Sequence, residues 1–121
     1  MHDVPRKKLL YIEDDESAWR VVHRRLRDRY VLIRAKTDVE ACVMLRQFGH
    51  ELCGILCDIH LGGDLSGLDL ARLVRGKVDL SLLPAWAHDV PAIHAPIIVI
   101  TGDPSRGHTA LDAGVSAVLG K

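Results

Sequence analysis

The sequence predicts a doubly wound α/β domain with five parallel strands. Short apolar runs alternate with segments of helical periodicity along the chain, and units of this length connect by right-handed crossovers into a parallel sheet. Several apolar runs also end in polar residues. A parallel sheet brings such residues together at the carboxyl edge of its strands, where ligands bind.

The first unit pairs a buried strand over residues 8–13 with a helix over residues 16–29. The apolar side chains of this helix recur at helical spacing, at Ala18, Val22 and Leu26. Arginines occupy its other face. The second unit has a short strand over residues 31–35. Its helix is capped by Thr37 or Asp38 and ends at Gly49. Its expected inward side chains are Val39, Cys42, Val43 and Phe48.

The third strand covers residues 54–58 and leads into a loop that contains Gly62 and Gly63. Ser66 then caps a helix that breaks near Gly76. These residues complete the third unit.

The fourth strand covers residues 96–101. A short helix starts at Pro104 or Ser105 and ends at Gly114, and residues 115–120 form the fifth strand. The alternation of strand and helix therefore continues to the end of the sequence.

The length and composition of the chain narrow the classes of function that it can have. The 121 residues suit one domain, and no apolar run approaches the roughly 18 residues of a membrane span. Sixteen basic and sixteen acidic residues cancel, so no whole-domain field attracts nucleic acid or an anionic membrane. The start is not a signal peptide. We expect a cytoplasmic protein without membrane or direct nucleic-acid binding.

The three cysteines, Cys42, Cys53 and Cys57, lie in apolar stretches. An odd number in such positions favours reduced, buried thiols over a disulfide framework. A zinc site of Cys53, Cys57 and His60 is the weaker alternative, because the spacing fits no standard pattern and a fourth ligand is missing.

The polar residues at the predicted sheet edge indicate a cation and phosphate site. The first strand ends in Glu13 and Asp14, the third in Asp58 and the fourth in Thr101, while Lys121 follows the fifth. Clustered carboxylates repel by about 4 kcal/mol per pair at an effective dielectric near 20, so the cluster favours a divalent cation. Oxygen ligands with positions left for water and phosphate suit Mg²⁺.

Each residue alone also has an ordinary structural interpretation. The acids at residues 13–16 fit the solvated start of a helix, Asp58 and Thr101 fit local caps, and Lys121 is terminal. Their joint placement at one edge, in the order of the strands, favours a site.

Five segments together resemble the receiver domain of two-component response regulators, a flavodoxin-like (CheY-like) fold with strand order 2-1-3-4-5. They are LLYIEDDE, GILCDIHL, SGLDLARLVR, PIIVITGDP and GVSAVLGK. The resemblance covers nearly the whole chain. The family's phosphoryl donors are histidine kinases or phosphotransfer proteins, and its targets are output domains or downstream proteins.

The resemblance implies a role for each edge residue. Asp58 would be the phosphoacceptor, and Glu13 and Asp14 would hold Mg²⁺ together with Asp58 and the backbone carbonyl of His60. Thr101 would follow the phosphoryl group and Lys121 would pair with it. Such a domain is not an enzyme in the usual sense, because it promotes only its own phosphotransfer and autodephosphorylation.

The sequence departs from the family around the site. The loop after Asp58 is one residue longer and contains two glycines, which predicts greater flexibility. Val118 replaces the aromatic residue that many receivers carry there. His60 and Asp103 occupy variable positions that in the family tune access of water to the acyl phosphate.

A larger departure is the long segment at residues 77–95. Long loops of this kind are usually functional, so we expect an interaction surface. Trp86 either anchors that interface or packs onto the domain itself.

The sequence also stops after the fifth strand, so the family's final helix is missing. We expect residues 1–121 to be a receiver domain cut from a longer protein, with homodimerisation as the alternative cover for the exposed sheet face. One competing function is a pseudo-receiver that only binds proteins. Another, a haloacid dehalogenase-like phosphatase, is disfavoured because His60 stands where its second aspartate belongs.

Overall fold

The sheet and helices of the chain form the predicted doubly wound fold. The computed structural model describes residues 6–61, 63–102 and 107–120. Its sheet has the order β2-β1-β3-β4-β5 with every pairing parallel. The predicted fold class and strand order are therefore confirmed. The strands are β1 (Lys7–Ile12), β2 (Tyr30–Ala35), β3 (Leu52–Asp58), β4 (Ile97–Thr101) and β5 (Ala117–Gly120).

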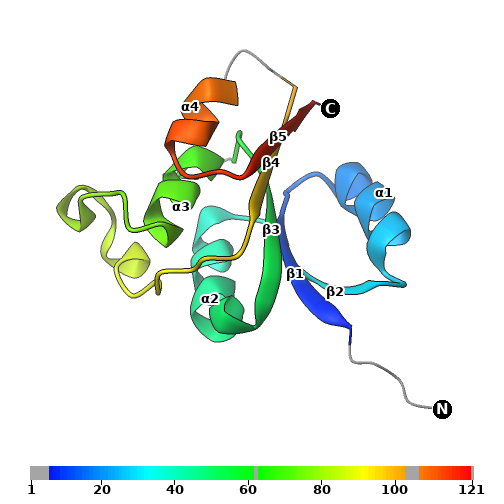
Figure 1. The fold of residues 1–121 in the computed structure, drawn as a ribbon. Coiled ribbons are helices and arrows are strands. Elements are labelled where there is room, and N and C mark those ends of the chain that lie inside the picture. Colours follow the sequence, from blue (N-terminus) through cyan, green and yellow to red (C-terminus); the bar gives the residue numbers. More distant parts are fainter. Residues whose placement is uncertain (1–5, 62, 103–106, 121) are drawn as a thin grey trace.

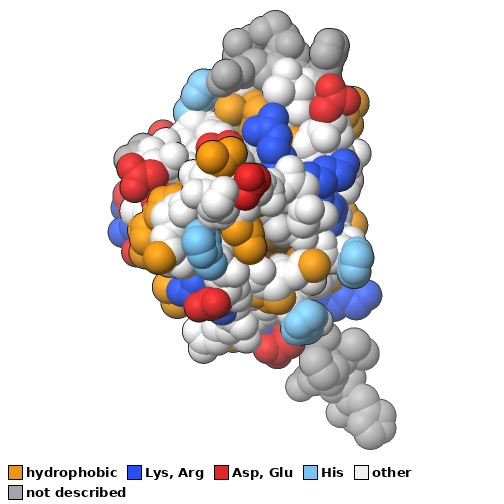
Figure 2. All heavy atoms as spheres, turned by 90° about the vertical axis from the view of Figure 1, so that its left-hand side faces the viewer, with side chains coloured by type: hydrophobic (Ala, Val, Ile, Leu, Met, Phe, Trp, Pro, Cys, Tyr) orange, Lys and Arg blue, Asp and Glu red, His pale blue; other side chains and the backbone are white. Residues whose placement is uncertain are grey.

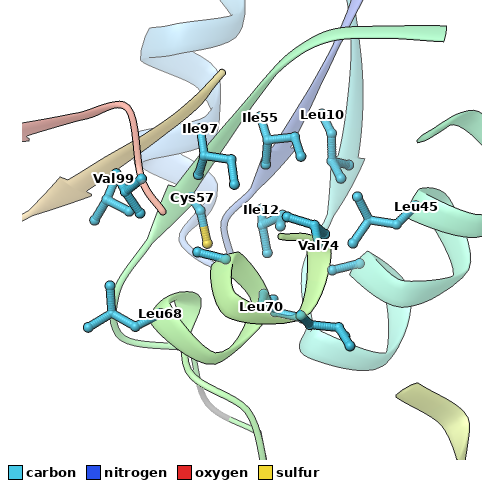
Figure 3. Packing of buried hydrophobic residues seen from close by; sticks show 14 of the residues in the cluster. Leu10, Ile12, Leu45, Ile55, Cys57, Leu68, Leu70, Val74, Ile97 and Val99 are labelled. Atoms are coloured by element: carbon cyan, nitrogen blue, oxygen red, sulfur yellow. The ribbon is translucent and has the colours of Figure 1, made fainter. Parts of the chain in front are cut away.

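The helices divide unequally between the two faces of the sheet (Figure 1). α1 (Glu16–Leu26) lies on one face, and the other face carries α2 (Asp38–Phe48), α3 (Gly67–Val74) and α4 (Gly107–Asp112). The main core lies between β1, β3 and β4 and these three helices. Figure 3 shows Cys57 of β3 pointing toward α3 between apolar side chains from both layers.

Local sequence signals determine where the helices start and end. Ser66 forms a capping box with Asp69 at the start of α3, and Thr37 caps α2 by accepting a hydrogen bond from the Glu40 N–H. Gly76 follows α3 and Gly114 follows α4, each with positive φ. Glycine adopts that conformation without the steric cost that a side chain imposes.

Two predicted inward side chains of α2 point to solvent instead. Val39 and Val43 are 45% and 41% exposed. The buried stripe of α2 is made by Asp38, Ala41, Cys42 and Leu45. These residues follow the i, i+3, i+4, i+7 spacing of one helix face, and the small side chains on it let the helix approach the sheet. The prediction for Val39 and Val43 was therefore wrong.

Helix α1 is shorter than predicted. It ends at Leu26, and Arg27 is its C-cap, because the chain must turn back before β2 begins at Tyr30. None of its residues is fully buried. Its apolar face is therefore only half covered by the sheet.

The segment at residues 77–95 packs onto the domain through part of its length. It contains the short 3₁₀ turns η2 (Leu80–Leu82) and η3 (Ala85–Ala87). Trp86 packs against the core, and its carbonyl accepts a 2.8 Å hydrogen bond from Arg46. Packing onto the domain is thus the interpretation of Trp86 that the structure supports.

Other parts of this segment face solvent, and Leu82 is 79% exposed. Figure 2 shows this side of the molecule, where hydrophobic side chains are interspersed with acidic, basic and histidine side chains. An interaction surface at residues 77–95 stays a prediction.

The face of the sheet that carries α1 is open beside that helix. A groove there is lined by Tyr11, Val21, Val22, Ile100 and Gly120, among others. In the part of the chain that the structure describes, α1 is the only helix on this face. No described helix has the length and apolar character needed to cross a membrane.

Candidate functional site

Three polar side chains are buried at the carboxyl ends of neighbouring strands. Glu13 directly follows β1, Asp58 ends β3 and Thr101 ends β4. Their exposed fractions are 0%, 7% and 0%. Buried carboxylates are costly unless other groups compensate their charge, so a pair of them at one edge marks a specialised place in the fold.

Strand register explains why these residues meet. Ile12 pairs with Cys57 across β1 and β3, which places Glu13 and Asp58 one residue further along adjacent strands. Asp58 in turn pairs with Ile100, the residue before Thr101. Since β3 lies between β1 and β4, Asp58 occupies the middle of the edge.

The acidic run after β1 separates into different environments. Glu13 is fully buried and its N–H donates to the carbonyl of Ala35, whereas Asp14 is exposed. Asp15 caps α1 by accepting a 2.8 Å hydrogen bond from the Ser17 N–H. The ordinary interpretation as a helix start therefore fits Asp15 but not Glu13.

Glu16 completes the acidic run on the surface. It forms ion pairs with Arg34 at 2.8 Å and with Lys36 at 3.3 Å. Hydrogen bonds from these two side chains lower the pKa of Glu16. Glu16 thus belongs to a surface ion-pair group rather than to the buried edge.

The carboxylate and the backbone of Asp58 are both held by the segment that follows β3. The His60 N–H donates a 3.0 Å hydrogen bond to Asp58 Oδ1. Gly67, the first residue of α3, lies so close that a Cβ there would come well inside 3.0 Å of the Asp58 carbonyl oxygen. The Cys57 thiol donates to the same carbonyl at 3.2 Å. Asp58 is therefore held in one orientation.

The negative charge at this edge raises the pKa values of two neighbouring side chains. Burial, followed by the charges of Glu13 and Asp58, raises the pKa of Tyr11 to about 12. Burial and then the same two carboxylates also raise the pKa of the Cys57 thiol. The negative charges of Glu13 and Asp58 therefore both lie near Tyr11 and Cys57.

The donor chemistry of the edge fits a hard divalent cation. The Cys57 thiol donates its S–H to the Asp58 carbonyl, and burial raises its pKa, so the thiol is less suited to the site than the carboxylates. Cys42, Cys53 and Cys57 are all free. Cys42 and Cys57 are buried as expected, whereas Cys53 is only half-buried. The hard donors present are carboxylate oxygens, which suit Mg²⁺.

The described residues contain no group of three or more His, Cys, Asp or Glu side chains placed to hold a metal ion. Mg²⁺ commonly uses one or two carboxylates and completes its octahedron with water and phosphate oxygens. The buried pair of Glu13 and Asp58 is compatible with that mode of binding.

The structure brings together some of the predicted site residues, while others lie outside the residues that it describes. Glu13, Asp58 and Thr101 lie at one edge, with Asp14 exposed beside them and the His60 backbone next to Asp58. Lys121 and Asp103 lie outside the described residues, as does the start of the last predicted helix at Pro104 or Ser105. Thr101 pairs with Gly120, the residue that precedes Lys121.

Asp38 and Gly67 contact this region but were not predicted to do so. Asp38 is 3% exposed, and its Oδ2 accepts a hydrogen bond from Leu65 in the loop after Asp58. The available signal was that Thr37 and Asp38 both fit the single cap position of α2. Since one cap suffices, the second polar side chain was free for a tertiary contact.

Comparisons with known proteins identify similar structures. No model of a known protein family matches the sequence, and no curated protein matches it. A response regulator from Burkholderia pseudomallei, solved with a phosphorylated aspartic acid, a calcium ion and citrate, is 29% identical with a TM-score of 0.68. That match covers 95% of this chain and 59% of the other, so the chain spans 59% of that protein's length.

Two further structures share the fold at lower identity. The receiver domain of the sensor histidine kinase PA1611 from Pseudomonas aeruginosa is 22% identical, with a TM-score of 0.70 and coverage of 97% and 86%. The chemotaxis protein CheY4 from Vibrio cholerae is 19% identical, with a TM-score of 0.72 and coverage of 97% and 88%.

Proposed function

Because the chain has the fold of the CheY-like receiver domains of response regulators, we propose that it is a phosphoacceptor domain. Asp58 would accept a phosphoryl group from a histidine kinase or a phosphotransfer protein. The observation that carries the proposal is the burial of Glu13, Asp58 and Thr101 at the carboxyl ends of three adjacent strands. The phosphorylated aspartic acid in the Burkholderia pseudomallei response regulator supports it.

Mg²⁺ is the proposed cofactor, held by Glu13, Asp14, Asp58 and the backbone carbonyl of His60. The magnesium ion in the active-site cleft of the PA1611 receiver domain supports this assignment. When bound, the ion supplies positive charge that offsets the repulsion between the carboxylates and the incoming phosphoryl oxygens.

The side chains of the chain perform the remaining work. A carboxylate oxygen of Asp58 forms the new bond to phosphorus while the bond between phosphorus and the donor nitrogen breaks. The His60 N–H fixes the orientation of the Asp58 carboxylate before the reaction. Lys121 would pair with the phosphoryl oxygens as charge accumulates on them.

The acyl phosphate then changes the electrostatics of the edge. It carries a charge of about −1.5 to −2 and three acceptor oxygens. Thr101 supplies a hydroxyl at the end of β4, and its movement toward these oxygens would shift the end of that strand. That shift is the proposed output signal.

The proposed role places the domain in the cytoplasm, between a kinase or phosphotransfer protein and an output domain or downstream protein. Direct binding of nucleic acid is not expected, because 16 basic and 16 acidic residues leave no net charge. The domain would catalyse only its own phosphotransfer and autodephosphorylation. We also propose that residues 1–121 form one receiver domain of a longer protein, with a homodimer as the alternative.

Intact-protein mass spectrometry tests the proposal directly. After incubation with acetyl phosphate and Mg²⁺, the wild type is expected to gain one phosphoryl group, and Asp58→Asn none. Asp64→Asn is the matched control, because Asp64 is an exposed acid of the same loop. The control is expected to behave as the wild type.

Two outcomes would contradict the proposal. An adduct that persists in Asp58→Asn would place the acceptor elsewhere. A wild type that takes no phosphoryl group at any Mg²⁺ concentration would identify the domain as a pseudo-receiver that acts by binding other proteins.

A further inference from the structure

Asp38 makes a buried contact with the loop that follows Asp58. Asp38 is the first residue of α2 and is 3% exposed. Its Oδ2 accepts a 2.9 Å hydrogen bond from the Leu65 N–H, and its Oδ1 accepts a 2.8 Å bond from the Val39 N–H. The Leu65 bond joins residues that are far apart in the sequence, so it is a tertiary contact rather than a local cap.

Capping of α2 does not account for Asp38. The cap is Thr37, whose hydroxyl accepts a hydrogen bond from the Glu40 N–H at 3.1 Å. Burying a second polar side chain beside it has a desolvation cost, which the Leu65 bond offsets. The negative charge of Asp38 also contributes to raising the pKa of Cys42, one turn along α2.

Gly63 fits against the same carboxylate. A Cβ at Gly63 would come well inside 3.0 Å of both Asp38 carboxylate oxygens. The side chain of any other residue at position 63 would therefore have no space beside Asp38. Asp38 and Gly63 therefore form one fitted contact between α2 and the loop.

The loop is thus fastened at both ends. On the side of β3, the Gly67 N–H donates to the Ile59 carbonyl at 3.0 Å, and the His60 N–H binds the Asp58 carboxylate. On the side of α3, Leu65 is buried and held by Asp38. Leu65 lies two residues before Gly67, so movement at Leu65 would act through the Gly67–Ile59 hydrogen bond on the residue next to His60.

We propose that Asp38 is a positioning residue that holds the loop after Asp58 and thereby sets the placement of the His60 backbone at the acceptor site. This inference rests on the proposed phosphoacceptor function and assigns it a regulatory contact. Greater flexibility of this loop stays a prediction, and the contacts of Gly63 and Leu65 with Asp38 would limit movement at those two residues.

The first test follows the loop itself without metal. Amide hydrogen exchange of Leu65 is measured by NMR in the wild type, Asp38→Ala, Asp38→Asn and Thr37→Ala. Thr37→Ala is the matched control, because it weakens the start of α2 but leaves the Leu65 bond in place. Relative to core amides, protection of Leu65 is expected to fall about tenfold in Asp38→Ala and to stay unchanged in the control.

The second test follows the site. The Mg²⁺ concentration for half-maximal phosphorylation by acetyl phosphate is expected to rise about tenfold in Asp38→Ala, since a loosened His60 backbone must be ordered again on binding. Asp38→Asn keeps one acceptor oxygen and is expected to fall between the wild type and Asp38→Ala. Thr37→Ala is expected to match the wild type.

A double-mutant cycle tests whether Asp38 and Gly63 act through their mutual contact. In the wild-type background, Gly63→Ala is expected to weaken protection of the Leu65 amide. In the Asp38→Ala background the same substitution is expected to have a much smaller effect, because the carboxylate that the new methyl group would meet is gone.

Equal Leu65 protection in Asp38→Ala and Thr37→Ala would overturn the proposal, as would an unchanged Mg²⁺ requirement in Asp38→Ala. A wild type that is not phosphorylated would instead refute the proposed function. In that case the exchange measurement still decides whether Asp38 holds the loop.

Discussion

At the scale of single residues, the candidate site is defined by close contacts around Asp58. Its carbonyl lies against Gly67 and accepts a hydrogen bond from the Cys57 thiol, while its carboxylate accepts one from the His60 backbone. Little free space remains around the main chain at this point. Small changes there are expected to have large effects.

Substitution Gly67→Ala tests this tightness. A methyl group would collide with the Asp58 carbonyl, so α3 must shift or β3 must distort. Helix propensity favours alanine by up to about 1 kcal/mol, but overpacking costs about 1–3 kcal/mol, so we expect a net loss of about 1–2 kcal/mol in the free energy of unfolding.

Urea denaturation gives that value, and the rate of phosphorylation by acetyl phosphate is expected to fall as well. Gly102→Ala serves as the control, because a Cβ there meets no atom of the residues that the structure describes within 4 Å. Equal stability of the Gly67→Ala and Gly102→Ala proteins would contradict the close approach of α3 to Asp58.

Cys42 is expected to make stability depend on pH in the alkaline range. Burial, with a smaller contribution from the Asp38 charge and against an opposing effect of Arg46, raises the pKa of Cys42 from 9.0 to about 11. The folded protein therefore holds this proton more tightly than the unfolded chain. The resulting stabilisation is complete below pH 9 and is lost as the pH rises through 11.

Urea denaturation of the reduced protein between pH 8 and pH 11 checks this dependence. Above pH 9 the wild type should lose up to about 1.4 kcal/mol per pH unit more than Cys42→Ala. Parallel curves for the two proteins would show that Cys42 ionises equally easily in the folded and unfolded states.

At the scale of elements, Arg75 connects three segments at the C-terminal end of α3. Its guanidinium donates to the carbonyls of Ile93 at 2.6 Å, Ala95 at 2.8 Å and Gly114 at 3.0 Å. The first two belong to the end of the long segment before β4, and Gly114 follows α4. One side chain thus joins α3, the entry to β4 and the turn into β5.

Loss of this connection is expected to destabilise the domain. Arg75→Ala leaves three part-buried carbonyls without their charged donor, which we expect to cost about 2–4 kcal/mol in the free energy of unfolding. Arg75→Lys should recover only part of it, since an ammonium lacks the planar fork of donors.

Denaturant titration compares Arg75→Ala with Arg72→Ala, which removes a half-exposed ion pair with Asp69 from the same helix. That control is expected to change stability by less than about 1 kcal/mol. Similar losses for Arg72→Ala and Arg75→Ala would mean that the three carbonyls do not depend on Arg75.

Much of the fold and part of the site could be predicted from the sequence, because the signals are local. Alternating apolar runs predict the parallel sheet, and Ser66 and Gly114 mark helix ends. The convergence of Glu13, Asp58 and Thr101 follows from parallel strands alone.

The remaining features depend on contacts between residues that are distant in the sequence. The rotation of α2, which exposes Val39 and Val43, is determined by how closely the helix packs on the sheet. The contacts of Asp38 with Leu65 and of Gly67 with Asp58 likewise join different elements, so no spacing rule indicates them.

At the scale of the whole molecule, the two faces of the sheet differ in how well they are covered. α2, α3 and α4 cover one face, whereas the groove beside α1 exposes apolar side chains such as Val21, which is 56% exposed. Exposed apolar surface of this kind normally marks an interaction site. Either a further segment of a longer protein or a second copy of the chain could cover the groove.

The isolated domain of residues 1–121 is therefore expected to bind a hydrophobic dye such as anilinonaphthalene sulfonate. Val21→Lys should reduce the dye fluorescence at least about twofold, because it places a charge in the groove. Val43→Lys, on the exposed side of α2, is the control and should leave the fluorescence unchanged. Equal effects of the two substitutions would mean that the dye does not bind in the groove.

The parallel arrangement of the sheet also has a consequence for the newly synthesised protein. Glu13, Asp58 and Thr101 come from three strands that are separated by complete helices in the sequence. A chain still on the ribosome, with β3 and α3 emerged but β4 inside the exit tunnel, lacks a neighbour on one side of Asp58. The edge that carries Asp58 is therefore completed only after β4 has left the tunnel, and under the proposed function a chain at the earlier stage would not yet accept a phosphoryl group.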